Sequence, residues 1–295
     1  MKIAFIGLGT MGLPMARNCI ENGHDVVGFD LNSTALENHV ANGGTVAQTG
    51  AEAATDADLI VTMVPNASHV RAALFEPDGI LDGMDSSALV IEMSTIHPLE
   101  SDGIREKAAS RGFALIDGPV GRTSMHAQSG QLLIMAGGTK SQIKQAGPVF
   151  DSVGDTVIDC GGPGMGIRMK MINNFMSIVN NVVTAEALTL AESIGLDVNM
   201  AVDVMSGTAA GQGHMSTTYQ AKALQGDLTP AFMLELAHKD LGLALDLAAQ
   251  VQAPVPMGAA AREMYTIARR QGRGQQDWTA IYEGIRELAG LEHSK

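Results

Sequence analysis

Residues 2–30 carry the pattern that most limits the fold of this chain. A short apolar run, Lys2–Ile6, passes into GLGTMG at residues 7–12, and a helical pattern continues through Asn22. A second strand-like run, Asp25–Phe29, ends directly before Asp30. Because the chain has 34 glycines in 295 residues, the spacing G-x-G-x-x-G alone carries little information. Its context is specific, since strand, glycine turn, helix, strand and acid in this order predict the first βαβ unit of a doubly wound parallel sheet.

The glycine turn predicts a dinucleotide site. Glycines allow the tight turn and let the backbone approach a pyrophosphate, whose charge is stabilised by the helix N-terminus. Asp30 can accept hydrogen bonds from the ribose hydroxyls and would repel a 2′-phosphate, and no Arg follows it in residues 31–34 (LNST). We therefore expect NAD(H) rather than NADP(H), with a packing turn without ligand as the alternative. The expected contacts here are Gly7, Gly9, Thr10, Met11, Gly12 and Asp30.

The alternation of strands and helices continues to about Cys160. Further strands are predicted at residues 59–64, 89–93, 113–116, 131–136 and 156–159. Ligands of an open parallel sheet bind outside the carboxyl ends of the strands. The ends of the first two of these strands therefore add Val64, Pro65 and Thr95 to the expected cofactor site.

Residues 161–196 predict one long helix. The segment opens with a Gly/Pro turn, has neither Pro nor Gly from Ile167 to Ile194, and is apolar on nearly all sides, which is typical of a buried helix. One polar stripe at helical spacing would face a cleft, because lysine is rarely buried without a partner. Alternatively, the lysine reaches solvent and the amides only cap neighbours. The stripe consists of Gly166, Lys170, Asn173, Asn174, Ser177 and Asn181.

Beyond Leu196 only helices are predicted. They lie at residues 198–205, 232–250, 257–271 and 277–289, separated by Gly-rich segments at 207–214 and 272–274. These segments could cover a site or simply connect helices. Lys239 lies in the second helical pattern and could reach a cleft, although a surface position is the usual one for lysine.

Composition excludes several classes of protein. The net charge of −13 disfavours nucleic acid and anionic membranes as partners. Two cysteines give no disulfide framework, and the eight histidines show no metal-ligand spacing, so no metal is expected. We find no signal peptide and no apolar run of about 18 residues. These features predict a cytoplasmic protein.

Four strings in fixed order, IAFIGLGTMG, DGPVG, GMGIRMKMINN and LAHKD, resemble the β-hydroxyacid dehydrogenase family over essentially the whole chain. The resemblance implies an N-terminal Rossmann domain (1–162) joined by a long helix (about 165–195) to an all-α C-terminal domain (163–295), and a homodimer or homotetramer. It implies Lys170 as the catalytic lysine, Asn174 as a substrate-orienting residue and Lys239 as a lysine that closes over the nicotinamide.

The loop after residue 117 departs from the family pattern. The family's D-x-P-V-S-G-G holds a carboxylate on serine and glycine amides, whereas this chain has Gly121-Arg122-Thr123. Arg122 presents a planar fork of donors suited to sulfonate, phosphate or carboxylate, and Thr123 and Ser124 add hydroxyls. Asn173 to Ser177 on the long helix could meet the same anion. The alternative is an Arg122 that forms a surface ion pair.

These observations and the resemblance together predict an NADH-linked reductase that acts on a short aldehyde with an anionic tail. A sulfonate is the expected anion, ahead of a carboxylate. As hydride reaches the carbonyl carbon, the Lys170 ammonium can donate a proton to the oxygen. The nearest alternative is a dehydrogenase for a carboxylated β-hydroxyacid or semialdehyde. An alternative of another class is a non-catalytic NAD-binding sensor.

Overall fold

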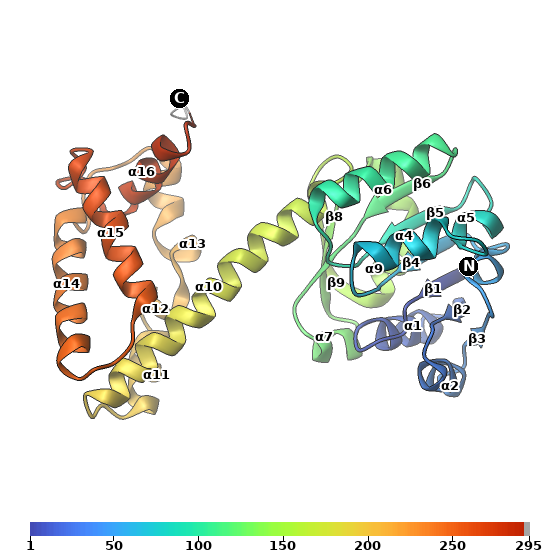
Figure 1. Ribbon diagram of the computed structural model, residues 1–295, viewed down its shortest axis with the longest axis horizontal. Coiled ribbons are helices and arrows are strands. Elements are labelled where there is room, and N and C mark those ends of the chain that lie inside the picture. The colour runs from blue at the N-terminus through green and yellow to red at the C-terminus, as the bar shows by residue number, and fades with distance from the viewer. Residues whose placement is uncertain (292–295) are drawn as a thin grey trace. The chain divides into compact units, whose positions relative to one another are not determined.

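The first strands form a six-stranded sheet in the order β3-β2-β1-β4-β5-β6, and every neighbouring pair in it is parallel (Figure 1). This computed structural model describes residues 1–291. The order is that of a dinucleotide-binding Rossmann sheet, which confirms the predicted fold class. The strands are β1 (Lys2–Ile6), β2 (Asp25–Phe29), β3 (Thr45–Val46), β4 (Leu59–Thr62), β5 (Leu89–Glu92) and β6 (Ala114–Asp117).

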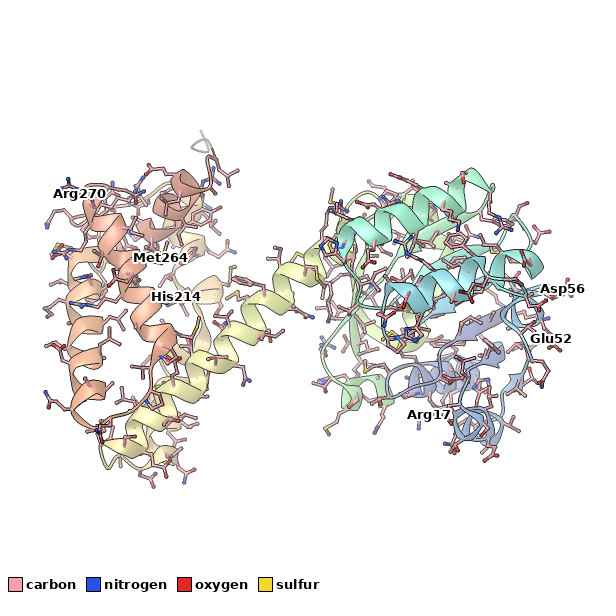
Figure 2. The ribbon with its side chains drawn as sticks, in the orientation of Figure 1. Arg17, Glu52, Asp56, His214, Met264 and Arg270 are labelled. Atoms are coloured by element: carbon pink, nitrogen blue, oxygen red, sulfur yellow. The ribbon has the colours of Figure 1, made fainter. Side chains whose placement is uncertain are left out.

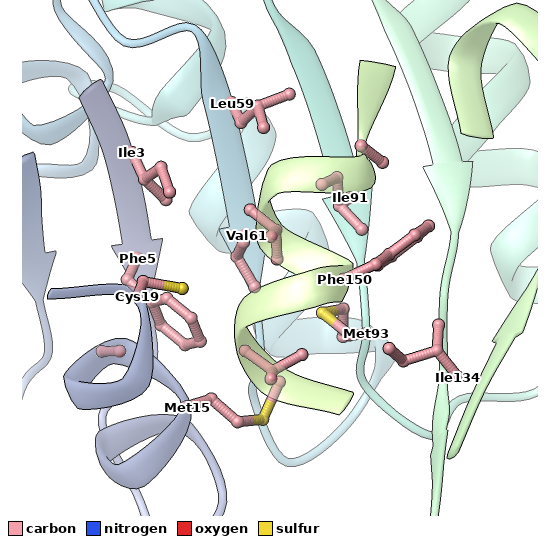
Figure 3. Close-up of a cluster of buried hydrophobic side chains, with 14 of the residues drawn as sticks. Ile3, Phe5, Met15, Cys19, Leu59, Val61, Ile91, Met93, Ile134 and Phe150 are labelled. Carbon is pink, nitrogen blue, oxygen red and sulfur yellow. The ribbon is translucent and has the colours of Figure 1, made fainter. Parts of the chain in front are cut away.

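Helices cover both faces of this sheet, so its strands are buried on both sides and are almost continuously apolar. Alternate residues of β1, β2, β4, β5 and β6 enter two separate cores, whereas β3, at the edge of the sheet, is exposed. Ile3, Phe5 and Ile91 pack on one face with Met15 and Phe150 (Figure 3). The helices of this part are α1 (Gly12–Glu21), α2 (Ser33–Ala41), α3 (Gly50–Ala54), α4 (Ala67–Phe75), α5 (Ile80–Gly83), α6 (Pro98–Ser110), α7 (Ser124–Gln128), α8 (Lys140–Gln145) and α9 (Gly147–Val153).

The strands predicted at residues 131–136 and 156–159 exist but belong to a second, three-stranded sheet. There β8 (Leu132–Ala136) pairs antiparallel with β7 (Val120–Gly121) and parallel with β9 (Gly154–Asp159). The sequence did not predict β7, because two residues are too few to show a period. A bridge between Asp117 and Gly137 links β6 to the end of β8.

The long helix α10 runs from Met165 to Ser193 (Figure 1). The chain divides into two compact units at Phe175/Met176, inside this helix. This division lies 13 residues beyond the predicted domain boundary at 162/163, which stays a prediction. The expectation that α10 is buried is wrong beyond its first turns, because Ile172, Phe175 and Ile178 are 64–69% exposed.

The second unit is helical in its described part, residues 176–291. Glu186 of α10 accepts hydrogen bonds from the first amides of α15. His214, which is labelled in Figure 2, lies edge-on against Trp278, with ring centroids 4.7 Å apart. Residues 207–214, predicted as a glycine-rich loop, are largely helical. Among residues 1–291, no helix combines the length and apolar character needed to cross a membrane. The elements are α11 (Val198–Ser206), α12 (Ala209–Gln212), α13 (His214–Thr217), η1 (Tyr219–Ala221), η2 (Ala223–Gln225), α14 (Leu234–Gln250), α15 (Pro256–Arg270), η3 (Trp278–Ala280) and α16 (Ile281–Leu288).

One buried carboxyl lies at the carboxyl end of the main sheet. Glu92 of β5 is 1% exposed; its Oε1 accepts a hydrogen bond from the Ser94 amide at 2.7 Å, and its Oε2 has no partner among the described residues. Burial raises the pKa of Glu92 from 4.5 to about 7, against the opposing effect of the Ser94 hydrogen bonds. The folded state therefore favours the protonated carboxyl.

This pKa predicts a pH-dependent effect of Glu92→Gln. Because the folded pKa is raised, the folded state binds more protons than the unfolded state above pH 4.5, and stability falls as pH rises through about 7. Glutamine cannot ionise, so the variant should gain about 2–3 kcal/mol relative to the parent protein between pH 5 and pH 8. Urea unfolding at both pH values measures the difference, and parallel pH profiles would contradict the prediction.

Candidate active site

A cavity of about 840 Å³ lies at the carboxyl ends of β1, β2, β4 and β5. Its size is within the range of small-molecule and cofactor sites. The structure brings together around it all but one of the expected cofactor contacts. These are Gly7, Gly9, Thr10, Met11, Gly12, Asp30, Val64, Pro65 and Thr95. Lys239 belongs to the second unit, where its ammonium lies 3.0 Å from Asp240.

The three glycines of the turn have different reasons to lack a side chain. A Cβ at Gly7 would overlap the Met63 carbonyl, and one at Gly12 would overlap the Gly7 carbonyl. Both are therefore required by packing, and Gly7 also has φ = 97°. A Cβ at Gly9 would meet no atom within 4 Å, so Gly9 leaves open space at the cavity. That space, beside an α1 N-terminus with no acidic residue in its first turn, fits a pyrophosphate.

Asp30 connects the glycine turn to the end of β2. Its Oδ2 accepts a hydrogen bond from the Leu8 amide at 2.7 Å, and its Oδ1 accepts one from the Asn32 amide at 2.8 Å. Each oxygen has further lone pairs for ribose hydroxyls. The same carboxylate thus orders the turn and places a negative charge on the cavity wall.

Ser94 holds the neighbouring walls of the cavity together. Its hydroxyl accepts a hydrogen bond from the Val64 amide at 2.9 Å, and its own amide donates to buried Glu92. The loops after β4 and β5 are therefore tied to each other beneath Pro65 and Thr95. Sequence reasoning did not identify the link from Ser94 to Glu92.

Asp117, at the end of β6, caps the N-terminus of α10. Its Oδ1 accepts a hydrogen bond from the Gly164 amide at 2.5 Å, and its Oδ2 accepts one from the Ile167 amide at 2.7 Å. A Cβ at Gly137 or Gly166 would press against this carboxylate. Burial raises the pKa of Asp117, while the two amides oppose that shift. Sequence reasoning missed this cap. The signal that could have indicated it was Asp117 at the end of a strand, together with the glycines at residues 137 and 166.

Lys170 lies one turn beyond the cap. Its ammonium donates a hydrogen bond at 2.6 Å to the carbonyl of Val120, the first residue of β7. Partial burial lowers the pKa of Lys170 below that of an exposed lysine. An ammonium has three N–H donors, so two remain for other acceptors. This arrangement can hold a proton next to the DGPVG loop.

Arg122 follows that loop with the left-handed φ of 72°. Its guanidinium donates hydrogen bonds to the Asp155 carboxylate at 2.7 Å and to the Gln131 carbonyl, on the three-stranded sheet. The structure therefore shows Arg122 in an ion pair, which was the alternative interpretation. Of its two hydroxyl neighbours, Thr123 lies 2.9 Å from His126 Nδ1 and Ser124 begins α7.

The amides expected to orient a substrate lie on α10. Asn173 donates a hydrogen bond to Asn174 at 3.3 Å, one turn from Lys170. Asn174 is partly buried and Asn173 is exposed. Ser177 is exposed and belongs to the second unit, so its part in the site remains a proposal. The cavity also includes His69, which sequence reasoning missed. Its amide donates a hydrogen bond to Oδ1 of Asn66, the N-cap of α4, and its ring Nδ1 lies 2.7 Å from the same oxygen.

Comparison with known families matches both parts of the chain. Residues 2–162 match the family described as the NAD binding domain of 6-phosphogluconate dehydrogenase. Residues 164–285 match the family described as NAD-binding of NADP-dependent 3-hydroxyisobutyrate dehydrogenase. The first unit, with its glycine turn and Asp30, is therefore an NAD(H)-binding domain.

Individual relatives align over nearly the full length. The chain is 52% identical over 289 residues to 3-sulfolactaldehyde reductase of Escherichia coli (strain K12), covering 98% of this chain and 97% of that enzyme. It is 32% identical to NAD-dependent L-serine dehydrogenase of Pseudomonas aeruginosa, covering 95% and 96%. A solved structure of Mycobacterium tuberculosis 3-hydroxyisobutyrate dehydrogenase with L-serine is 32% identical, with a TM-score of 0.68 over 97% of this chain and 99% of that chain.

The position of Asp30 predicts a preference for NADH over NADPH. Like charges a few ångströms apart near a protein surface repel by roughly 1–4 kcal/mol, so a 2′-phosphate beside Asp30 is disfavoured. Asp30→Asn keeps an acceptor for the Leu8 amide and should narrow the NADH/NADPH ratio of kcat/KM by about tenfold or more. Asp25→Asn, at the exposed start of the same strand, is the matched control. Equal use of both cofactors by the unaltered protein would contradict the prediction.

Proposed function

The chain belongs to the β-hydroxyacid dehydrogenase family and is an NAD-dependent oxidoreductase, and from that premise we propose that it reduces 3-sulfolactaldehyde to 2,3-dihydroxypropane-1-sulfonate with NADH. The observation that carries this proposal is the 52% identity, over nearly both full lengths, to 3-sulfolactaldehyde reductase. Gly121-Arg122-Thr123, in place of the family's serine and two glycines, supports a bulkier, tetrahedral anion.

In this proposal Lys170 is the general acid. NADH, when bound, supplies the hydride that the carbonyl carbon receives. Negative charge then grows on the carbonyl oxygen, and one of the Lys170 N–H groups not used by Val120 donates the proton that makes the alcohol. The lowered pKa of Lys170 supports this role, because an acid whose pKa is closer to the working pH gives up its proton more readily.

The proposed anion contacts come from the loop after β6 and from α10. Arg122 would release Asp155 and bind the sulfonate instead. Their ion pair is partly exposed, so breaking it costs little free energy. Thr123 and Ser124 add hydroxyl donors from the same loop, and Asn173, Asn174 and Ser177 meet the substrate from α10. We also propose that Lys239, from the second unit, closes over the nicotinamide.

A carboxylated substrate is the second candidate. It is favoured by the L-serine dehydrogenase and by the 3-hydroxyisobutyrate dehydrogenase solved with L-serine, both 32% identical. Steady-state kcat/KM with NADH across sulfonated, phosphorylated and carboxylated short aldehydes separates the candidates. The proposal requires the sulfonated aldehyde to be the best substrate. A better carboxylated substrate would replace it, and turnover of none would indicate a non-catalytic NAD-binding sensor.

The exposed apolar side of α10 supports a homodimer or homotetramer. Phe175, Ile178 and Val182 recur at helical spacing on one side and are 43–69% exposed. A second copy of the chain would remove this surface from water. Light scattering that gives a monomer mass would contradict the assembly.

The half-buried Cys160 and fully buried Cys19, both free thiols, suit the cytoplasm that we propose.

The general acid role predicts that Lys170→Ala lowers kcat by about 10²–10⁴-fold, the usual contribution of a positioned acid. The NADH dissociation constant, measured by fluorescence, should stay within about twofold, because the cofactor contacts lie elsewhere in the first unit. Lys140→Ala, at the exposed start of α8, is the control for loss of a lysine. A folded Lys170→Ala protein with normal turnover would refute the role.

The anion role of Arg122 predicts opposite effects for the two partners of its ion pair. Arg122→Ala should cost about 10- to 150-fold in kcat/KM for the sulfonated aldehyde, as expected for a lost charge-assisted hydrogen bond. Asp155→Asn removes the competing carboxylate and should raise kcat/KM by up to about fivefold. A neutral short aldehyde should respond to neither change. If both variants lower activity equally on both aldehydes, Arg122 only stabilises the loop.

A further inference from the structure

We propose that Asp102 on α6 and Arg168 on α10 are positioning residues for the reaction, which fix the rotation of the first turns of α10 and thereby the place of the Lys170 ammonium. The inference rests on the proposed role of Lys170 as general acid. Neither residue touches the cofactor cavity, and neither was singled out by its sequence pattern.

The pair is a forked ion pair. Arg168 Nη2 lies 2.5 Å from Asp102 Oδ2, and Arg168 Nη1 lies 3.2 Å from Asp102 Oδ1. Arg168 Nη1 also donates to the Gly164 carbonyl at 2.9 Å, and Arg105 donates to Asp102 Oδ1 at 2.8 Å. The hydrogen bond from Arg168, followed by those from Arg105, lowers the pKa of Asp102 to about 2. Two parallel N–H···O contacts fix direction as well as distance.

The pair completes a set of three attachments around α10. Arg168 and Lys170 are two residues apart, so they project about 200° apart around the helix. Lys170 is held by the Val120 carbonyl on one side, and Arg168 is held by Asp102 on the other. Asp117 holds the helix at its N-terminus. The cap holds the end of the helix, and the two lateral attachments, on opposite sides, oppose rotation of its first turns about the helix axis.

Gly164, directly before α10, lies against the charged groups of Asp102, Arg105 and Arg168. Gly164 has φ = 86°, and a Cβ there would lie 2.7 Å from Arg168 Nη1 and 2.9 Å from both Arg105 Nη1 and Asp102 Oδ1. The charged groups therefore pack directly on bare backbone. The positive φ already favours glycine at this position, and its bare Cα lets the three charged side chains lie close to the backbone.

The expected loss is in catalysis more than in folding. Ion pairs of this partial exposure contribute little to stability. A displacement of about 1 Å in a catalytic group can lower the rate by about 10²-fold. Arg168→Met keeps the length of the side chain and removes the fork, so it should lower kcat by about 10- to 100-fold with an NADH dissociation constant within about twofold of the parent value.

The control is the ion pair between Arg111, the C-cap residue of α6, and Asp82 of α5. Arg111 pairs with Asp82 at 3.2 Å, and its side chain is 39% exposed, as is that of Arg168. Arg111→Met should leave kcat unchanged. Arg168→Lys, which restores the charge without the fork, should recover part of kcat. Asp102→Asn combined with Arg168→Met should lose little more than Arg168→Met alone, because the two residues act as one unit.

A direct readout of Lys170 separates this inference from the proposed function. The pH midpoint of Lys170 acetylation by trace acetic anhydride, followed by mass spectrometry, reports its pKa in the whole protein. Arg168→Met should move that midpoint upward, toward an ordinary lysine, because a rotated helix exposes the ammonium. If Arg168→Met leaves the midpoint unchanged, or if Arg111→Met lowers kcat equally, the inference is overturned. A shifted midpoint with unchanged kcat would support the positioning role and refute Lys170 as the acid.

Discussion

The two hydrogen bonds that the Asp117 carboxylate accepts from the Gly164 and Ile167 amides fix where α10 begins. The first amides of a helix have no partners within the helix, and a carboxylate at this position satisfies two of them while stabilising the positive end of the helix dipole. Because Asp117 is the last residue of β6, these hydrogen bonds hold the start of α10 against the end of the main sheet. The side chain of Lys170 and the loop that it contacts therefore share one anchor.

That anchor explains a group of glycines far apart in sequence. Gly137 follows β8, and Gly166 lies in the first turn of α10, yet a Cβ at either would lie within 3 Å of the Asp117 carboxylate. Glu92, opposite Asp117 in the register of β5 and β6, is equally buried. Two carboxyls on adjacent strands repel, which adds to the burial that raises the pKa of Glu92. One strand end thus orders the helix, and its neighbour orders the cofactor wall through Ser94.

The sequence predicted the features that depend on neighbours in the chain. The glycine turn, Asp30 and the strand ends at Val64 and Thr95 were found because a βαβ unit places them at fixed local spacing. The length of α10 followed from its lack of Gly and Pro. Features that depend on distant partners were not predicted. The Asp117 cap, the pairing of β7 with β8 and the Arg122–Asp155 ion pair join residues that are 12 to 50 positions apart in the sequence, and no local pattern specifies such pairing.

The wrong prediction for α10 has the same origin. A helix that is apolar on all sides was expected to be buried. The sequence pattern shows which side chains are apolar, but it does not show which part of the protein, or which second copy, packs against them. Near Ile167 the cover is the first unit, and near Glu186 the helix instead caps α15. Between them, Ile172, Phe175, Ile178, Val182 and Val183 remain exposed in the single chain. Lys170 lies within one turn of this stretch, and Asn174 and Ser177 lie inside it, so the same helix that carries the proposed chemistry carries the surface that a second copy would cover. Assembly and catalysis would then depend on the same helix, which accounts for the apolar residues of α10 that stay exposed in the single chain.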